Sequence, residues 1–299
     1  MGLQPKNVLI TGANRGLGLE LVKQFLRLPS PPKTLLATCR SPENAKDLND
    51  LASKHSNVKV LKLDVTQPTA FENFPKLVES FIEGEGLNLL INNAGINIRH
   101  GLEEADSESM METYTTNVIG PLRMVQLVYL AKEGLNLLIN NAGIAYKKQF
   151  LGNLEKQTLI EQFDVNIFGP ILVSQALLPY IKQAAKSSTD TSLNCNRAAI
   201  VNMSSILGSM AENQSGGLYP YRTSKAALNM LTKNMNVDLK SEGILCFCMH
   251  PGWVQTDMGG PNAAVVKETS IAGILDVMSK MNGETSDIFI DYNGQSVPW

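Results

Sequence analysis

The sequence predicts an α/β fold built on one parallel sheet with helices on both faces. Two observations carry this prediction. Short apolar runs alternate with helix-like stretches along all 299 residues, as expected of strands joined by crossover helices. Most of these runs are continuously apolar, which is typical of strands that are buried on both faces. No segment is rich enough in Gly, Ser or Pro to be a linker, so residues 1–299 are expected to form a single domain.

The apolar runs define the elements in order. The candidate strands are Asn7–Ile10, Thr34–Cys39, Val58–Leu63, Leu87–Ile91, Leu135–Ile139, Ala198–Met203, Ile244–His250 and Ile288–Asp291. Leu17–Leu28 has the periodicity of an amphipathic helix, and the prolines that follow it end that helix. A second clear helix is expected around Ser270–Lys280, and the polar stretch Lys186–Arg197 is expected to be a surface loop.

The fourth and fifth candidate strands lie in a repeat. Residues 85–96 and 133–144 both have the sequence EGLNLLINNAGI, 48 positions apart. The similarity continues into the following helix, where NVIGPL begins at Asn117 and NIFGPI at Asn166. We call residues 85–132 the first copy and 133–182 the second copy. Two strand-plus-helix units in an otherwise unrepeated chain do not make a solenoid. The simplest origin is two alternative versions of one exon, either translated together in a single chain or joined by the gene model.

A glycine-rich turn separates the first strand from the first helix. Its spacing, TGxxxGxG, lets the backbone approach a pyrophosphate, while the helix N-terminus supplies unpaired N–H groups and a partial positive charge. The expected contacts are Gly12, Asn14, Arg15, Gly16, Leu17 and Gly18. An ordinary strand-to-helix turn is the alternative, but the position between strand and helix favours a dinucleotide site.

The end of the second strand indicates which dinucleotide is bound. An acidic residue there would bind the ribose 2′-hydroxyl of NAD, but this chain has Arg40, and Arg15 projects from the glycine turn towards the same place. Two guanidinium groups suit a 2′-phosphate, which predicts NADPH. Asp64 and Val65, at the end of the third strand, are expected to contact the adenine.

Three residues have the chemistry of a proton-transfer site. Tyr221 and Lys225, at i and i+4, face the same side of a helix, and an ammonium near a phenol favours the phenolate. A buried strand ends in Ser204 and Ser205, and a serine hydroxyl there would hold a substrate oxygen. The two serines point to opposite faces of the strand, so both are candidates at this point. Tyr219 is a poorer candidate than Tyr221 because its i+4 residue is not a cation.

A further motif, PGWVQTD, follows the seventh of the eight candidate strands. Such a turn is expected to hold the nicotinamide carboxamide. The residues expected to do so are Pro251, Gly252, Val254 and Thr256.

Taken together, these residues resemble the short-chain dehydrogenase/reductase family. The matching motifs, in family order, are TGANRGLG, LDV, NNAG, NxxGP, NMSS, YRTSK and PGWVQTD. The stretches SSILGSM, GGLYPYRTSKAALN and FIDYNGQSVPW resemble its sniffer/C-factor-like carbonyl reductase branch. The resemblance implies a Rossmann-type, doubly wound parallel sheet of order 3-2-1-4-5-6-7. It also implies that Tyr221 is the general acid, that Lys225 lowers its pKa and binds the nicotinamide ribose, and that Ser205 positions the carbonyl.

The family also has an asparagine that holds a water in the proton relay, and the repeat offers two candidates. The 28 positions from Asp64 to Asn92 favour the first copy, and with it Asn117. The 39 positions from Asn166 to Ser205 favour the second copy. We choose Asn166, because the second copy has the fuller helix. Its strand would then end at Asn140, and its turn would supply the cofactor contacts Asn141, Ala142 and Gly143.

Three arrangements of the copies are open. Either the second or the first copy fills the single fourth-strand position and the other is displaced, or both are inserted in the sheet. Displacing one copy leaves the apolar strand LNLLIN exposed, which favours aggregation. Inserting both moves Ser205 and Tyr221 away from the glycine turn by one strand spacing, about 4.8 Å. Because a misplacement of about 1 Å can cost on the order of a hundredfold in rate, this last arrangement predicts an inactive enzyme.

Composition excludes several other classes of protein. The net charge is −2 with no basic block, which argues against nucleic acid or an anionic membrane as partner. No signal peptide and no run of roughly 20 apolar residues are apparent, so a cytoplasmic protein is expected. The 4 cysteines are expected to be buried thiols, and the 3 histidines have no ligand spacing, so no metal site is predicted.

The sequence therefore predicts an NADPH-dependent reductase that converts a small carbonyl compound, an aldehyde, ketone or quinone, to an alcohol. The alternative is a catalytically impaired nucleotide-binding protein, a sensor or scaffold, and the repeat supports it. Family members often pair through the helix after the fourth strand, which implies a homodimer.

Overall fold

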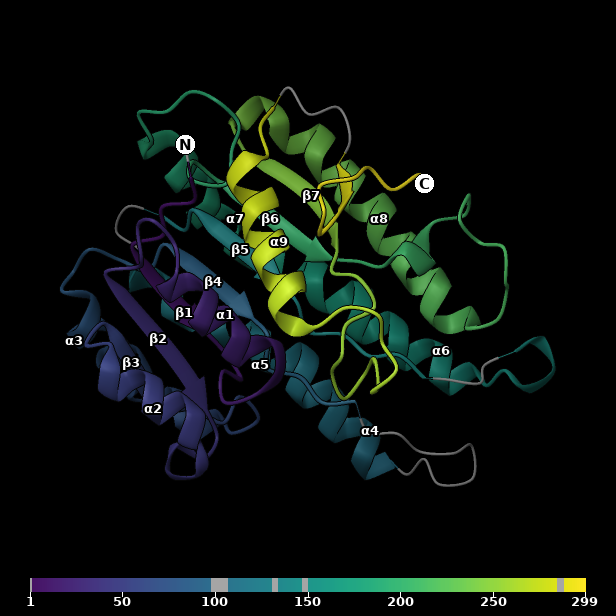
Figure 1. Cartoon of the computed structure of the whole chain (residues 1–299), viewed down its shortest axis with the longest axis horizontal. Coiled ribbons are helices and arrows are strands. Elements are labelled where there is room, and N and C mark those ends of the chain that lie inside the picture. The colour runs from purple at the N-terminus through teal and green to yellow at the C-terminus, as the bar shows by residue number, and fades with distance from the viewer. Residues whose placement is uncertain (1, 98–106, 131–133, 147–149, 284–287) are drawn as a thin grey trace.

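The sheet has eight parallel strands, in the order β3-β2-β1-β4-β5-β6-β7-β8 (Figure 1). The computed structural model describes residues 2–97, 107–130, 134–146, 150–283 and 288–299. The strands are β1 (Asn7–Ile10), β2 (Thr34–Cys39), β3 (Val58–Lys62), β4 (Leu89–Asn92), β5 (Leu137–Asn140), β6 (Ala199–Met203), β7 (Leu245–His250) and β8 (Phe289–Asp291). The predicted doubly wound parallel sheet is confirmed, with one strand more than the expected order.

Helices cover both faces of the sheet. They are α1 (Gly16–Leu26), α2 (Lys46–Lys54), α3 (Phe74–Ile82), α4 (Ser107–Tyr114), α5 (Gly120–Met124), α6 (Lys156–Phe163), α7 (Gly169–Ser187), α8 (Tyr219–Leu239) and α9 (Lys267–Lys280). The apolar side chains of α1, α2 and α9 share one core with one face of the strands. Those of α3, α5, α7 and the end of α8 share a second core with the other face. The helices predicted over Leu17–Leu28 and Ser270–Lys280 are α1, which starts one residue earlier and ends two residues earlier, and α9, which starts three residues earlier.

Both copies of the repeat are in the sheet, which is the third of the three arrangements. β4 and β5 are neighbours, and the register pairs each residue with its own repeat, from Leu89 with Leu137 to Asn92 with Asn140. All four residues of each strand are buried. Insertion satisfies the backbone of both strands and buries the apolar side chains that a displaced copy would expose.

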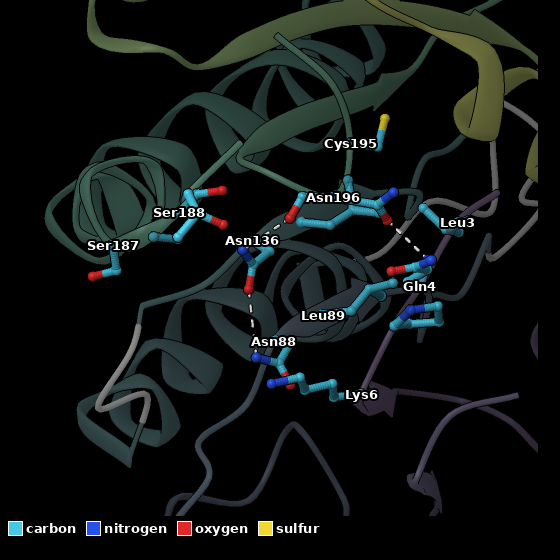
Figure 2. Close-up of a pocket in the computed structure, with 14 residues that line it drawn as sticks. Leu3, Gln4, Lys6, Asn88, Leu89, Asn136, Ser187, Ser188, Cys195 and Asn196 are labelled. Carbon is cyan, nitrogen blue, oxygen red and sulfur yellow. Dashed lines mark hydrogen bonds between the residues drawn. The ribbon is translucent and has the colours of Figure 1, made fainter. Parts of the chain in front are cut away.

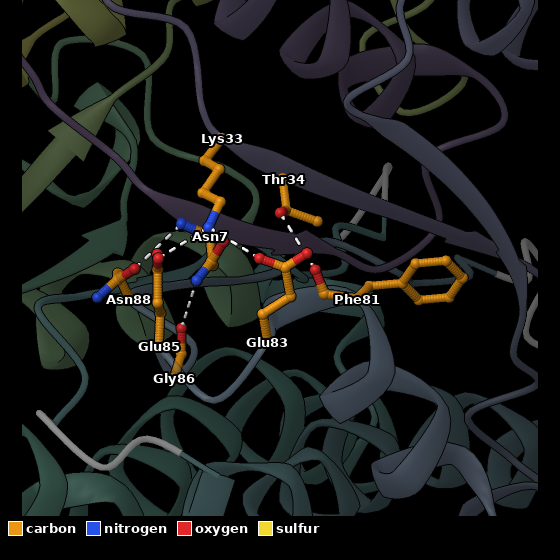
Figure 3. Close-up of polar contacts among 8 residues, drawn as sticks. All are labelled: Asn7, Lys33, Thr34, Phe81, Glu83, Glu85, Gly86 and Asn88. Atoms are coloured by element: carbon orange, nitrogen blue, oxygen red, sulfur yellow. Dashed lines mark hydrogen bonds and ion pairs between the residues drawn. The ribbon is translucent and has the colours of Figure 1, made fainter.

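The identical segments that lead into these strands are held by different neighbours. In the first copy, the Asn7 side chain donates to the Gly86 carbonyl at 2.8 Å, and the Asn88 side chain accepts from the Asn7 backbone at 3.0 Å (Figure 3). Lys33 adds ion pairs with Glu83 and Glu85 at 3.2 and 2.7 Å. The first copy is therefore fixed against β1 and the start of β2.

The second copy is fixed against β6 and its own helix. The Asn136 amide donates to the carbonyls of Asn196 and Arg197 at 3.0 and 2.8 Å. The backbone N–H of Leu135 donates to the Tyr180 carbonyl in α7 at 3.1 Å. The same amino acids thus make different contacts, because each copy meets different partners from distant parts of the chain.

A cavity of about 380 Å³ opens at the amino ends of β4 and β5 (Figure 2). Three asparagines on its wall are paired with one another or with backbone. Asn88 donates to Asn136 at 3.4 Å, and Asn196 accepts from the Gln4 backbone at 2.8 Å. Strand amino ends lie opposite the edge where the glycine turn and Ser205 lie, so this cavity is not the predicted reaction site.

The second copy also contains a long apolar helix. Residues 156–187 form one helix of 32 residues, which by length and composition could cross a membrane. Half of its most apolar window is buried inside the protein, and one such helix is weak evidence for a membrane span. The C-terminal part of this helix, α7, is the fuller helix that the sequence predicted for the second copy.

Candidate active site

The glycine turn is built against the first copy. Gly12 has φ +65°, and a Cβ there would lie 2.8 Å from the Ala94 Cα, so only glycine fits. The Asn93 side chain donates to the carbonyls of Thr11 and Gly12 at 2.8 and 3.0 Å. In return, the Thr11 hydroxyl accepts from the backbone N–H groups of Asn93 and Ala94 at 3.0 and 2.9 Å. The conformation of the glycine turn is therefore fixed by hydrogen bonds to the NNAG segment of the first copy.

The turn has the features that a dinucleotide pyrophosphate needs. A Cβ at Gly18 would lie 2.3 Å from the Gly12 carbonyl oxygen, so this cradle requires glycine. Helix α1 starts without a side-chain cap at Arg15 and without an acidic residue in its first turn, which leaves its N-terminus suited to an anion. The residues present fit the pyrophosphate of a nicotinamide dinucleotide.

The residues expected around the adenosine end lie beside this turn. The backbone N–H of Ala13 donates to the Thr38 carbonyl at 2.8 Å, which sets the turn against the end of β2, and the exposed Arg40 follows two residues later. Arg15 is exposed and forms an ion pair with Asp257, a residue that no prediction had assigned to the site. Asp64 Oδ1 accepts a hydrogen bond from the Thr66 hydroxyl at 2.7 Å, within the loop that follows β3.

Lys225 and Tyr221 lie together at the carboxyl end of β6. Lys225 is 5% exposed, and its Nζ donates to the Met203 carbonyl at 2.8 Å and lies 5.8 Å from the centroid of the Tyr221 ring. Burial lowers the pKa of Lys225 to about 8, although Cys248 opposes this shift. The lysine is therefore a positioned cation that titrates near neutral pH.

Ser205 completes this group. Burial raises the pKa of Tyr221 above its usual value of about 10, and a hydrogen bond from Ser205 acts in the opposite direction. The resemblance implied a pKa lowered by Lys225, so the direction in the structure differs. Burial is the larger effect, and Lys225 donates to a backbone carbonyl instead. The Ser204 hydroxyl points elsewhere and contacts Asn229 Oδ1 at 2.5 Å.

The two candidate asparagines occupy matching places in their copies. Each lies in a five-residue π-helical segment, Thr115–Ile119 or Asp164–Phe168. Asn117 is paired with the backbone of Ile96, and Asn166 with that of Ile144, in each case with both side-chain atoms at 2.8–2.9 Å. Asn166 alone of the two also donates to α8, through Ser224 Oγ at 3.0 Å. The structure therefore brings Asn166, and not Asn117, to the helix that carries Tyr221.

The cofactor turn and the proton-transfer group belong to different copies. A Cβ at Gly143, in the second copy, would lie 3.6 Å from Lys225 Nζ. A Cβ at Gly12, in the glycine turn, would instead lie 2.8 Å from the Cα of Ala94, in the first copy. The two NNAG turns are neighbours, since Asn141 donates to Asn93 Oδ1 at 2.9 Å. The site is thus divided into two halves, offset by one strand spacing of about 4.8 Å.

The predicted residues divide between these halves. The first half holds Gly12, Asn14, Arg15, Gly16, Leu17, Gly18, Arg40, Asp64 and Val65. The second half holds Asn141, Ala142, Gly143, Asn166, Ser205, Tyr221 and Lys225. A loop after β7 holds Pro251, Gly252, Val254 and Thr256, whose hydroxyl accepts from the Gly259 N–H at 3.1 Å. Sequence reasoning missed Asn93 and Ala94 as contacts of the glycine turn, although the spacing from Asp64 to Asn92 pointed to them.

Comparison with known proteins fits this division. A family model for the short chain dehydrogenases matches residues 6–134 and, separately, residues 130–266. This chain belongs to the short-chain dehydrogenase family. The first match ends and the second begins where the second copy starts, so each match contains one copy of the repeat.

Solved structures of carbonyl reductases match nearly the whole chain. The carbonyl reductase Sniffer of Drosophila melanogaster is 37% identical, with a TM-score of 0.72, over 99% of this chain and 100% of that one. An NADPH-bound carbonyl reductase from chicken fatty liver is 36% identical, with a TM-score of 0.66 and the same coverage. The C-signal protein of Myxococcus xanthus is 41% identical over 149 residues, which are 50% of this chain and 83% of that protein. The chain is thus similar to carbonyl reductases, and its family is one of oxidoreductases that use nicotinamide cofactors.

Proposed function

We propose that this chain binds NADPH and carries the catalytic group of a carbonyl reductase, which converts a small aldehyde, ketone or quinone to an alcohol. The observation that carries the proposal is the group of buried Ser205, half-buried Tyr221 and buried Lys225 at one edge of the sheet, with Lys225 Nζ donating to the Met203 carbonyl. The similarity to an NADPH-bound carbonyl reductase supports the choice of substrate class and cofactor.

Each side chain has a defined task in this reaction. When bound, NADPH supplies a hydride to the carbonyl carbon. Tyr221 donates a proton to the carbonyl oxygen, and its raised pKa keeps it protonated at neutral pH, as a general acid must be. Ser205 holds the same oxygen by a hydrogen bond and stabilises the charge that develops on it. Asn166, paired with Ser224, fixes the neighbouring turn of α8.

The cofactor contacts come from the first half of the site. The α1 N-terminus and the glycine cradle suit the pyrophosphate, while Arg15 and Arg40 suit a 2′-phosphate better than a free hydroxyl. Lys225 and the turn Asn141–Gly143 would hold the nicotinamide ribose in the second half. We place the protein in the cytoplasm, as a homodimer that acts on small molecules.

The added strand limits this chemistry. The two halves are offset by about one strand spacing, and an error of about 1 Å in the position of reacting groups can cost on the order of a hundredfold in rate. We therefore expect NADPH binding to persist and turnover to be slow.

The same observation favours a second candidate, a protein that binds the nucleotide without turnover and acts as a sensor or scaffold. Calorimetry with NADPH, combined with the oxidation of NADPH in the presence of aldehyde, ketone and quinone panels, separates the two. Binding with no oxidation of NADPH above the buffer rate by any substrate supports the second candidate.

Tyr221→Phe tests the mechanism. It should abolish the NADPH oxidation that the wild-type protein shows, because the proposed reaction takes its proton from the Tyr221 hydroxyl. Tyr219→Phe is the matched control, since Tyr219 is 38% exposed and its i+4 residue is Thr223. If Tyr221→Phe retained wild-type activity, the assigned mechanism would be wrong.

A further inference from the structure

A loop after β7 reaches back across the sheet to the cofactor turn. β7 is separated from β1 by β4, β5 and β6, which is about 19 Å at the usual strand spacing. Even so, Asp257 in this loop forms an ion pair with Arg15 at the start of α1. In Figure 1 the yellow-green loop lies beside α9, which packs on α1, on the side where the strand arrowheads point.

Internal hydrogen bonds hold the loop in shape. The backbone of Val265 donates to the Trp253 carbonyl at 2.9 Å and accepts from the Gln255 N–H at 2.8 Å. The Trp253 indole donates to the Gly259 carbonyl at 3.0 Å, and the Ser270 hydroxyl fixes the Pro251 carbonyl at 2.6 Å. Asp257 therefore projects from a preformed arm, residues 251–266, whose base is anchored to α9.

Arg15 is the guanidinium that suits a 2′-phosphate, and in this structure a carboxylate occupies it. A 2′-phosphate carries more negative charge than a carboxylate, and two anions that contact the same guanidinium repel each other. We propose that Asp257 and the 2′-phosphate of NADPH compete for Arg15. Asp257 therefore lowers the affinity of the protein for NADPH and reduces its preference for NADPH over NADH. This inference rests on the proposed cofactor site.

The expected change in affinity for a 2′-phosphate is small, because both side chains of the ion pair are exposed to solvent. The side chains of Arg15 and Asp257 are 69% and 81% exposed, so their ion pair is weak and a bound phosphate can displace it. Removing the carboxylate should tighten binding of a 2′-phosphate about fivefold, the range that an exposed ion pair supports. Ligands without a 2′-phosphate should gain less than about twofold.

The test measures binding and needs no turnover. Calorimetry at low salt compares adenosine 2′,5′-bisphosphate with 5′-AMP on the full chain, as wild type and as Asp257→Asn. Glu43→Gln is the matched control, because it removes the same charge from an exposed acid near the end of β2. The double variant with Arg15→Ala shows whether the effect acts through that guanidinium.

We expect Asp257→Asn to bind the bisphosphate about fivefold more tightly, with 5′-AMP and the Glu43→Gln variant nearly unchanged. The gain should disappear when Arg15 is replaced. Equal or weaker binding by Asp257→Asn, or an equal gain from Glu43→Gln, overturns the competition. If neither the wild type nor Asp257→Asn binds either ligand, the proposed cofactor site fails as well, which distinguishes the two failures.

Discussion

Asn92 and Asn140 lie opposite each other in adjacent strands, in identical sequences, but only the Asn140 side chain is hydrogen-bonded among the described residues. Both are almost fully buried, at 2% and 6% exposure. The Asn140 amide donates to Asn202 Oδ1 at 2.9 Å and to Ser174 Oγ at 3.2 Å. Neither polar atom of the Asn92 side chain has a partner among the described residues. Val125 stands in the first copy where Ser174 stands in the second.

Asn92→Val and Asn140→Val should therefore change stability in opposite directions. The first removes a buried amide that has no partner and should raise the free energy of unfolding by about 1 kcal/mol. The second leaves Asn202 and Ser174 without their donor and should lower it by about 1–3 kcal/mol. Urea denaturation of the two variants checks this. Destabilisation by Asn92→Val would show that its amide has a partner in solution, such as a buried water.

Deleting residues 85–132 should join the two halves of the site. The remaining strand would pair with β1 and β6 at once, and Tyr221 would move towards the glycine turn by one strand spacing, about 4.8 Å. We expect the rate of NADPH oxidation to rise at least about a hundredfold. Unfolding free energy and soluble yield should also rise, because the unpaired Asn92 is removed.

The control for this deletion is Tyr221→Phe in the shortened chain, which should cancel the gain in rate. A shortened chain that is less stable than the full one would mean that both copies are required structural elements.

The sequence predicted the local geometry well where it depends on spacing within one element or turn. Tyr221 and Lys225 share a helix face because they are four residues apart, and the glycine turn follows its strand directly. The structure also explains why the two spacing arguments about the repeat disagree. The first copy lies beside the glycine turn and the second beside Ser205, since the two intervals describe two different strands.

What the sequence could not decide depends on distant partners. Identical segments contain no information about which neighbour each will meet, and the choice rests on Asn7 for one and Asn196 for the other. The Arg15–Asp257 pair joins residues 242 positions apart through a loop whose path no motif predicts. The pKa of Tyr221 rises because of burial, which can be judged only once the fold is known.

Acid should weaken the fold through His250. Burial lowers the pKa of this histidine to about 4, from about 6.5 when unfolded, although Asp291 acts in the opposite direction. Between these values the unfolded chain binds a proton that the folded chain does not. Stability is therefore full above pH 6.5 and falls as pH drops towards 4, by up to about 1.4 kcal/mol per pH unit.

His250→Gln should flatten the pH dependence of the free energy of unfolding between pH 6.5 and 4, measured by urea denaturation at several pH values. His55→Gln is the matched control, because it makes the same substitution at an exposed histidine. An unchanged slope in His250→Gln would assign the acid sensitivity to the carboxylates.

Gly120 and Gly169 provide a second matched pair, which begins α5 and α7 in the two copies. A Cβ at Gly120 would lie 2.8 Å from Val65 Cβ, whereas at Gly169 the nearest atom would be 3.6 Å away. Gly120→Ala should therefore lower the free energy of unfolding by about 1–3 kcal/mol through overpacking. Gly169→Ala should raise it by about 0.5–1 kcal/mol, because alanine favours the helix.

The deletion of residues 85–132 should reverse the sign at Gly169. In the shortened chain α7 takes the place of α5 against Val65, so Gly169→Ala becomes destabilising there by about 1–3 kcal/mol. Thermal or urea unfolding of this variant in both chain lengths measures the change. If Gly169→Ala stabilised both chains equally, α7 would not have moved to the first position, and the two halves of the site would still be apart.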